Sequence, residues 1–291
     1  MIELFASDLD GTLLGALHAP GRIVKAAIRT ATEAGFHFAL ATGRTFRSPH
    51  DFGFGGVDVE VVCDNGAIVL DREGAVIRHV PVDPEVLEEL LRAFPGVPFD
   101  CVGLRHSYVT ASQEAYEAGF RSRGPVARAV DYVKLRAMYK GQVRYPDERL
   151  FDQRPEDVLA NDICKVNLHL ADEARTAEIE AFLAERRDRV VNAPFNPSMF
   201  EITEAGVNKG EAIAWLATYL GIPRENVAVY GDGGNDVEML RRFSAYGHAY
   251  ATHGASASAR RAAGLALGSN VLYAVPRHVT RTVREQAGHR A

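Results

Sequence analysis

Four short apolar segments of this 291-residue chain each end in small polar or acidic residues with a glycine close by. Helix-forming stretches alternate with these segments, which is the pattern of parallel strands joined by helices. The segments are Ile2–Ser7, leading into Asp8; Phe36–Ala41, leading into Thr42-Gly43-Arg44; Val59–Cys63, leading into Asp64-Asn65-Gly66; and Val227–Tyr230, leading into Gly231–Asp236. Any one of these ends alone is better interpreted as an ordinary turn, because Gly, Asn, Asp and Thr favour turns. Four together predict a ligand site at the carboxyl edge of a parallel sheet.

The middle of the chain interrupts this pattern. Pro84–Phe94 has apolar residues at helical spacing, and later segments such as Cys164–Leu170 alternate as strands of an antiparallel sheet do. The first pattern returns near Val207, whereas the stretch from Asn270 onward shows no periodicity that predicts an element. We predict an α/β protein with a Rossmann-like parallel-sheet core of residues 1–81 and 204–291, interrupted by an inserted α/β domain of residues 82–203.

Charge and cysteine content narrow the class of protein. The formal net charge is -5 and the pI is near 6.1, which argues against a protein that binds the nucleic-acid backbone. Cys63, Cys101 and Cys164 are widely spaced and lack CxxC pairing, as expected for reduced core residues. No apolar run approaches the roughly 18 residues of a membrane span. We therefore expect a cytoplasmic protein without nucleic-acid or membrane partners, either a monomer or a homodimer.

The first polar end contains two carboxylates that would repel each other. Asp8 and Asp10 are two residues apart, so their side chains point to the same side of an extended chain. A cation or a shared proton relieves such repulsion. With Asp232 they offer the hard oxygen ligands that suit Mg²⁺, which binds a few carboxylates, waters and substrate phosphate.

The other polar ends supply groups that suit a phosphoryl ligand. Such a ligand needs hydroxyl, N–H and cationic partners. The Thr42 hydroxyl and the Gly43 amide are two candidates, and Asn65 or Asn235 can add another. Lys209 begins a predicted helix, where the dipole disfavours a cation but where an anion would meet both the lysine and free N–H groups. Phosphoryl chemistry on a nucleophilic aspartate is therefore the favoured interpretation.

Five motifs, in this order, resemble those of the haloacid-dehalogenase (HAD) superfamily, in particular its Cof-type phosphatases. They are DLDGTLL at Asp8–Leu14, ATGR at Ala41–Arg44, NGA at Asn65–Ala67, NKG at Asn208–Gly210 and GDGGND at Gly231–Asp236. The resemblance covers both core segments and implies the HAD fold with an inserted α/β cap that selects the substrate. The cap segment matches in size and element pattern alone.

The resemblance assigns catalytic and metal roles to four aspartates. It implies that Asp8 is the nucleophile and carries an aspartyl-phosphate, and that Asp10 is the general acid and base. Asp8, Asp10 through its main-chain carbonyl, and Asp232 would hold Mg²⁺. Asp236 would lie close by in the metal or lysine network.

The resemblance also assigns the phosphate-binding groups. Thr42 and Lys209 would hold the transferring phosphoryl group, and Asn235 would contact phosphate. Arg44 and Asn65 would line the substrate side. The segment Ala249–Ala255 departs from the AMxNA-like pattern of such proteins, so substrate contacts are not carried over to it.

The leading functional hypothesis is a Mg²⁺-dependent phosphomonoester hydrolase acting on a small phosphorylated metabolite, such as a sugar phosphate or phosphorylated cofactor. One alternative is phosphoryl transfer to another hydroxyl, as in a phosphotransferase or phosphomutase. The other is a regulator that binds a phosphometabolite without turning it over.

Overall fold

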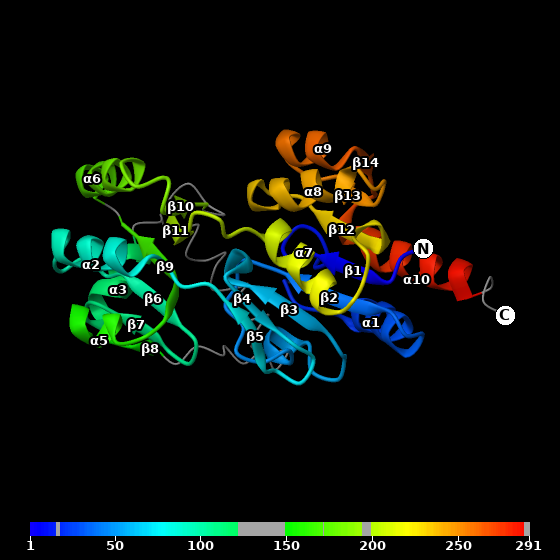
Figure 1. Ribbon diagram of the computed structural model, residues 1–291, viewed down its shortest axis with the longest axis horizontal. Coiled ribbons are helices and arrows are strands. Elements are labelled where there is room, and N and C mark those ends of the chain that lie inside the picture. Colours follow the sequence, from blue (N-terminus) through cyan, green and yellow to red (C-terminus); the bar gives the residue numbers. More distant parts are fainter. Residues whose placement is uncertain (16–17, 122–148, 171, 194–198, 288–291) are drawn as a thin grey trace. The chain divides into compact units, whose positions relative to one another are not determined.

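The four apolar segments lie next to one another in a single eight-stranded sheet, in the order β12-β1-β2-β3 (Figure 1). Their neighbours are parallel throughout. The bounds are Leu4–Ser7 for β1, His37–Ala41 for β2, Glu60–Cys63 for β3 and Val227–Gly231 for β12. The sheet continues from β12 with parallel β13 (Ala249–Ala251) and β14 (Leu265–Ala266), and from β3 with antiparallel β4 (Ile68–Leu70) and then β5 (Val76–His79). This parallel core confirms the predicted fold class.

The computed structural model describes all residues except 16–17, 122–148, 171, 194–198 and 288–291. The described residues divide into two compact units. The first contains the described residues of 1–78 and 208–287, and the second contains those of 79–121 and 149–207. Within the described part of the chain, no helix is long and apolar enough to cross a membrane.

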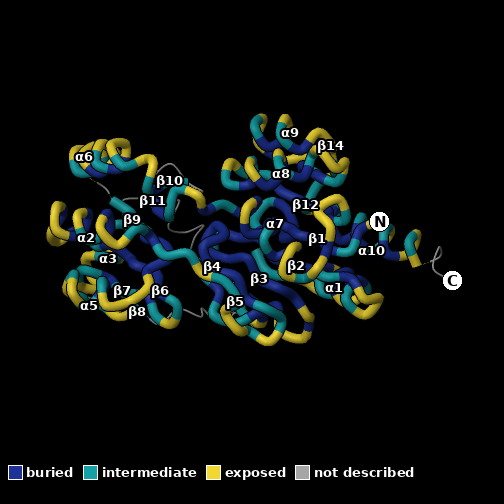
Figure 2. Tube along the Cα trace, viewed as in Figure 1, coloured by how far each residue is buried: buried dark blue, intermediate teal, exposed yellow. Residues whose placement is uncertain are grey.

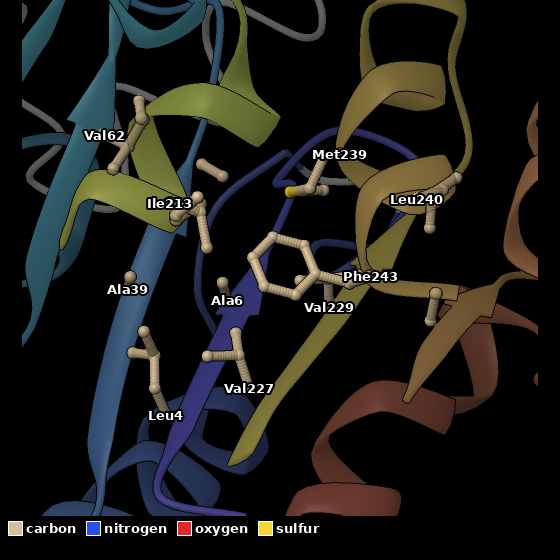
Figure 3. Close-up of a cluster of buried hydrophobic side chains, with 14 of the residues drawn as sticks. Leu4, Ala6, Ala39, Val62, Ile213, Val227, Val229, Met239, Leu240 and Phe243 are labelled. Atoms are coloured by element: carbon tan, nitrogen blue, oxygen red, sulfur yellow. The ribbon is translucent and has the colours of Figure 1, made fainter. Parts of the chain in front are cut away.

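Helices cover both faces of the eight-stranded sheet, which explains why its central strands are apolar along their whole length. Leu4, Ala6 and Val229 point to one face, where they pack with Ile213 and Phe243 in one core cluster (Figure 3). The helices on this face are α7 (Lys209–Tyr219), α8 (Val237–Ser244) and α9 (Ala257–Ala263). Residues alternate across a strand, so Phe5 and Tyr230 point to the other face.

The opposite face carries α1 (Arg22–Glu33) and α10 (Ala274–Ala287), which pack against each other. Tyr230 binds His278 of α10 there, through a 2.9 Å contact between its hydroxyl and Nδ1. Short 3-10 turns link the elements of this unit: η1 (Asp51–Gly53), η2 (Asp64–Gly66), η3 (Arg224–Asn226), η4 (Gly234–Asp236) and η5 (Asn270–Leu272).

The second unit contains a six-stranded sheet in the order β10-β11-β9-β6-β7-β8. Its pairs are antiparallel except β7 with β8, which are parallel. The strands are β6 (Asp100–Gly103), β7 (Ser107–Val109), β8 (Arg149–Leu150), β9 (Ile163–His169), β10 (Val190–Asn192) and β11 (Met199–Glu204), and the helices are α2 (Pro84–Ala93), α3 (Gln113–Arg121), α5 (Pro155–Leu159) and α6 (Glu173–Ala184). Asp83 caps α2 by accepting hydrogen bonds from Glu85 N and Val86 N. Figure 2 shows that the central strands of both sheets are buried.

Candidate active site

The predicted site residues of the first unit follow the carboxyl ends of four adjacent strands, except Lys209, which begins α7. Ser7 at the end of β1 pairs with Tyr230 of β12 on one side and with Leu40 of β2 on the other. The chain segments that follow these strands therefore begin at the same edge of the sheet. The topology, rather than any local preference, brings Asp8 and Asp232 together.

Three carboxylates form the centre of this edge. Asp8, Asp232 and Asp236 each offer an oxygen, and these atoms lie within 4.8 Å of one another. The Lys209 ammonium donates to Asp8 Oδ1 at 2.7 Å and to Asp236 Oδ1 at 2.6 Å. Lys209 is fully buried (0% exposed) at the first turn of α7, so its charge is used inside the site and not on the surface. One cation for three carboxylates leaves an excess of negative charge.

The pKa values of the three-carboxylate site reflect the same excess of negative charge. Burial raises the pKa of Asp8, and the nearby Asp236 raises it further despite the opposing effect of Lys209. Burial also raises the pKa of Asp232. Burial opposes the charge of Lys209, but Asp236 and Asp8 hold the pKa of this ammonium above its ordinary value. A divalent cation would stabilise the ionised carboxylates, and an all-oxygen donor set suits Mg²⁺.

Hydrogen bonds give the three aspartates different surroundings. Asp236 uses both oxygens, because Oδ1 accepts from Lys209 while Oδ2 accepts from the backbone N–H groups of Asp232 at 2.9 Å and Gly233 at 2.8 Å. Asp232 Oδ1 accepts from the Thr12 hydroxyl at 2.6 Å. The main contribution of Asp236 is thus to orient Lys209 and the Asp232 loop, which leaves Asp8 and Asp232 better placed to bind a cation.

Gly11 is required by the close approach of the β1 end to Asp232. It has φ +83°, and a Cβ built on it would lie 2.3 Å from Asp232 Oδ2. No other residue fits there without displacing that carboxylate. The glycine that follows Asp10 therefore serves packing of the site as well as the turn.

The side chain of Asp10 is not part of the three-carboxylate group. It forms a bidentate ion pair with Arg44, with Nε to Oδ2 at 2.8 Å and Nη2 to Oδ1 at 2.6 Å. His18 Nδ1 also contacts Oδ1 at 2.6 Å. Burial opposes ionisation, yet His18 and Arg44 lower the pKa of Asp10 to about 2. In this conformation Asp10 is an ionised carboxylate held by two partners.

The loops after β2 and β3 are joined by hydrogen bonds. Asn65 N donates to Thr42 O at 3.0 Å, and Asn235 Nδ2 donates to Asn65 Oδ1 at 3.1 Å. Thr42 is 2% exposed and its Oγ1 accepts from Arg44 N at 3.1 Å. Gly43 lies between these two residues. The structure thus brings the predicted phosphate-binding residues of three separate segments together.

Two residues with clear contacts to the site were missed by the sequence analysis. Thr12 lies inside the DLDGTLL motif, so its position two residues after Asp10 was an available signal. His18 lies in a segment without any motif, and its contact with Asp10 depends on the course of the loop. Local sequence carries no signal for it.

Comparison with known proteins identifies the family of this chain. Residues 5–275 match the family model of haloacid dehalogenase-like hydrolases. The chain belongs to this family. The predicted membership is therefore confirmed over nearly the whole chain, across both units.

Individual relatives and solved structures extend the comparison. The chain is 29% identical over 259 residues to the phosphatase YwpJ of Bacillus subtilis (strain 168), covering 82% of this chain and 86% of that protein. A haloacid dehalogenase-like hydrolase from B. subtilis has a similar fold, with a TM-score of 0.76 and 22% identity over 96% of this chain and 99% of that one. TM0651 from Thermotoga maritima also gives a TM-score of 0.76, with 22% identity and 97% coverage of both chains.

Proposed function

We propose that this HAD-type hydrolase is a Mg²⁺-dependent phosphatase that cleaves the phosphomonoester of a small metabolite through an aspartyl-phosphate on Asp8. The observation that carries the proposal is the cluster of Asp8, Asp232 and Asp236 around Lys209. A buried excess of negative charge is costly unless a cation compensates it. Relatives that are named phosphatases support the same reaction class.

Asp8 and Asp232 would hold Mg²⁺ with the main-chain carbonyl of Asp10. Bound there, the ion would neutralise charge on the phosphoryl oxygens and make attack by an anionic carboxylate possible. Lys209 would hold Asp8 in place and contact the phosphoryl group together with Thr42. Asn235 and the Gly43 amide would add further donors.

The reaction would proceed in two displacements at phosphorus. An oxygen of Asp8 forms a bond to phosphorus while the bond to the ester oxygen breaks, and Asp10 gives its proton to that leaving oxygen. Water then attacks phosphorus, Asp10 takes one of its protons, and the bond to Asp8 breaks to release inorganic phosphate. The two steps return both aspartates to their starting protonation states.

The contacts of Asp10 add a requirement to this mechanism. A carboxyl with a pKa of about 2 is unprotonated near neutral pH and cannot serve as an acid. Asp10 must therefore leave the Arg44 and His18 contacts before it donates a proton. Arg44 would then line the substrate side, and the inserted unit would select the leaving group.

The experiment is phosphate release from a panel of phosphorylated metabolites by the wild-type protein and by Asp8→Asn. With Mg²⁺ we expect turnover by the wild type, and at least about a 10⁴-fold lower rate for the variant, because the amide is a poor nucleophile. An aspartyl-phosphate trapped by acid quench should be found in the wild type alone. Undiminished turnover in Asp8→Asn would refute the assignment of Asp8 as the nucleophile. Labelled phosphate appearing on an acceptor hydroxyl instead of in water would favour the phosphotransferase alternative.

A further inference from the structure

The loops after β2 and β3 contain buried donors that find no acceptor among the residues the structure describes. They are Asn65 Nδ2 and Arg44 Nη1. The two loops are linked by Asn65 N to Thr42 O at 3.0 Å and Asp64 N to Arg44 O at 3.2 Å. A buried donor without an acceptor costs free energy, and in native proteins such a group calls for a ligand or another specific explanation.

The backbone of Asn65 is held in a conformation that asparagine tolerates better than most residues. It has φ 58° and ψ 20°, in the left-handed region, and the residue is 4% exposed. The next residue, Gly66, has φ +106°, and a Cβ on it would lie 2.6 Å from the main-chain oxygen of Asn208. The turn is thus packed against the residue that precedes Lys209. Its backbone is not free to rotate Asn65 toward another acceptor.

The partner of Asn65 Oδ1 determines where its NH₂ group points. Oδ1 accepts the hydrogen bond from Asn235 Nδ2 at 3.1 Å. Because the two ends of a planar amide point in different directions, Nδ2 faces away from Asn235. Both hydrogens on Nδ2 stay available to a ligand oxygen. One side chain therefore orients Asn235 and presents a donor of its own.

The hydroxyl of Thr42, like Nδ2 of Asn65, has a hydrogen available to donate. Its oxygen already accepts from Arg44 N, and the hydrogen bonds of the described residues include no acceptor for its proton. Thr42, Asn65 and Arg44 thus contribute donors from two linked loops. Hydrogen-bond donors of this kind suit an oxygen-rich anion such as a phosphoryl group.

We propose that Asn65 contacts the transferring phosphoryl group, with Nδ2 donating to a non-bridging oxygen, while Oδ1 positions Asn235 for the same group. This inference rests on the proposed phosphatase function and deepens it. Asn65 lies after β3 and Asn235 after β12, so the pair would clamp the phosphoryl group from two segments of the chain.

The test uses two variants that respect the left-handed backbone. Asn65→Asp keeps the shape but replaces the donor with a negative oxygen, and Asn65→Gly removes the side chain where positive φ is allowed. Asn161→Asp, an exposed asparagine of the second unit, is the matched control. For each folded protein we would measure kcat/KM on a phosphomonoester, the Kd for orthovanadate with Mg²⁺, and the Kd for Mg²⁺ alone.

We expect Asn65→Asp to weaken orthovanadate binding and kcat/KM by about 100-fold and Asn65→Gly by about 10-fold, because a hydrogen bond to a charged group is lost. Mg²⁺ binding without vanadate should stay within about twofold, since Asn65 is not a metal ligand in this proposal. Asn235→Ala should have less effect in the Asn65→Gly background than in the wild type. The control should match the wild type.

Failure of this inference differs from failure of the proposed function. A wild type that hydrolyses phosphomonoesters, with folded Asn65 variants that bind orthovanadate equally well, would refute the role of Asn65 alone. A wild type that neither binds orthovanadate nor hydrolyses any phosphomonoester would refute the function itself. Losses that follow the fraction of folded protein, with unchanged affinity per folded molecule, would reduce Asn65 to a structural residue.

Discussion

Both units bury charged side chains, but they balance these charges differently. In the second unit, Lys165 forms an ion pair with Glu201, and Asp100 accepts hydrogen bonds from Arg149 at 3.2 Å. In the candidate site of the first unit, Lys209 forms ion pairs with Asp8 and Asp236, and Asp232 lies beside them as a third carboxylate. Opposite charges paired one to one compensate each other inside the fold, whereas an excess of one sign favours a bound counter-ion or a proton. The comparison separates buried charge that serves the fold from buried charge that serves chemistry.

The largest effect is expected from removing the Lys209 ammonium, the positive charge beside the three carboxylates of the site. In Lys209→Met, Asp8 and Asp236 would face each other without compensation, so kcat should fall by at least about 10³-fold. The free energy of unfolding in the presence of a chelator should fall by about 3 to 5 kcal/mol, the range for a broken buried ion pair. Mg²⁺ should restore part of this stability. Urea unfolding with and without Mg²⁺ measures it.

The control for this prediction is Lys25→Met, the same change in α1, where the ammonium donates to Gly55 O at 2.9 Å. Its activity and its response to Mg²⁺ should match the wild type. A Lys209→Met protein with wild-type stability in the chelator would mean that the cluster does not need a cation, and the contrast between the units would disappear.

An intermediate effect is expected from the balanced pair in the second unit. Lys165→Met alone should lower the free energy of unfolding by about 3 kcal/mol, because it leaves a buried carboxylate uncompensated. The double variant Lys165→Met/Glu201→Leu should recover most of the loss. Mg²⁺ should change neither result. If the double variant were less stable than the single one, the pair would have a role beyond mutual compensation.

The smallest effect is expected from His278 of α10, on the pH dependence of stability. This histidine extends the comparison of buried charges to a buried group that is kept neutral. Burial, with Arg281 and His248, lowers the pKa of His278 to about 4 from its ordinary 6.5. Between these values the unfolded chain binds more protons than the folded one, so stability falls as the pH drops from 6.5 to 4. Allowing for screening of this half-buried ring, the loss is about 1 to 2 kcal/mol.

His278→Gln should flatten this part of the pH dependence, since glutamine has no proton to gain. Chemical unfolding at closely spaced pH values from 4 to 7 measures the difference between the variant and the wild type. Curves of equal slope would show that His278 titrates alike in the folded and unfolded chains.

The core strands were predictable because their environment leaves a strong pattern. Strands buried on both faces must be apolar along their length, so β1, β2, β3 and β12 stand out, with boundaries within one residue or two of those predicted. Helix α10 was missed although its buried stripe has helical spacing. Val275, Val279 and Val283 recur every four residues, while most of the other residues of the helix are polar. The sequence therefore carried a signal for this helix, but a weaker one than the continuous apolar runs of the core strands.

Sequence alone determined the kinds of side chain at the strand ends, and with them the family and the class of chemistry, because buried strands and turn residues leave local patterns. Tertiary structure alone decided which charges meet. Lys209 reaches Asp8 across 201 positions of the chain, and Asp10 turns to Arg44 and His18 instead of joining the nearby Asp8. Electrostatic partners depend on distance in space, and strand order, which local patterns do not encode, sets that distance.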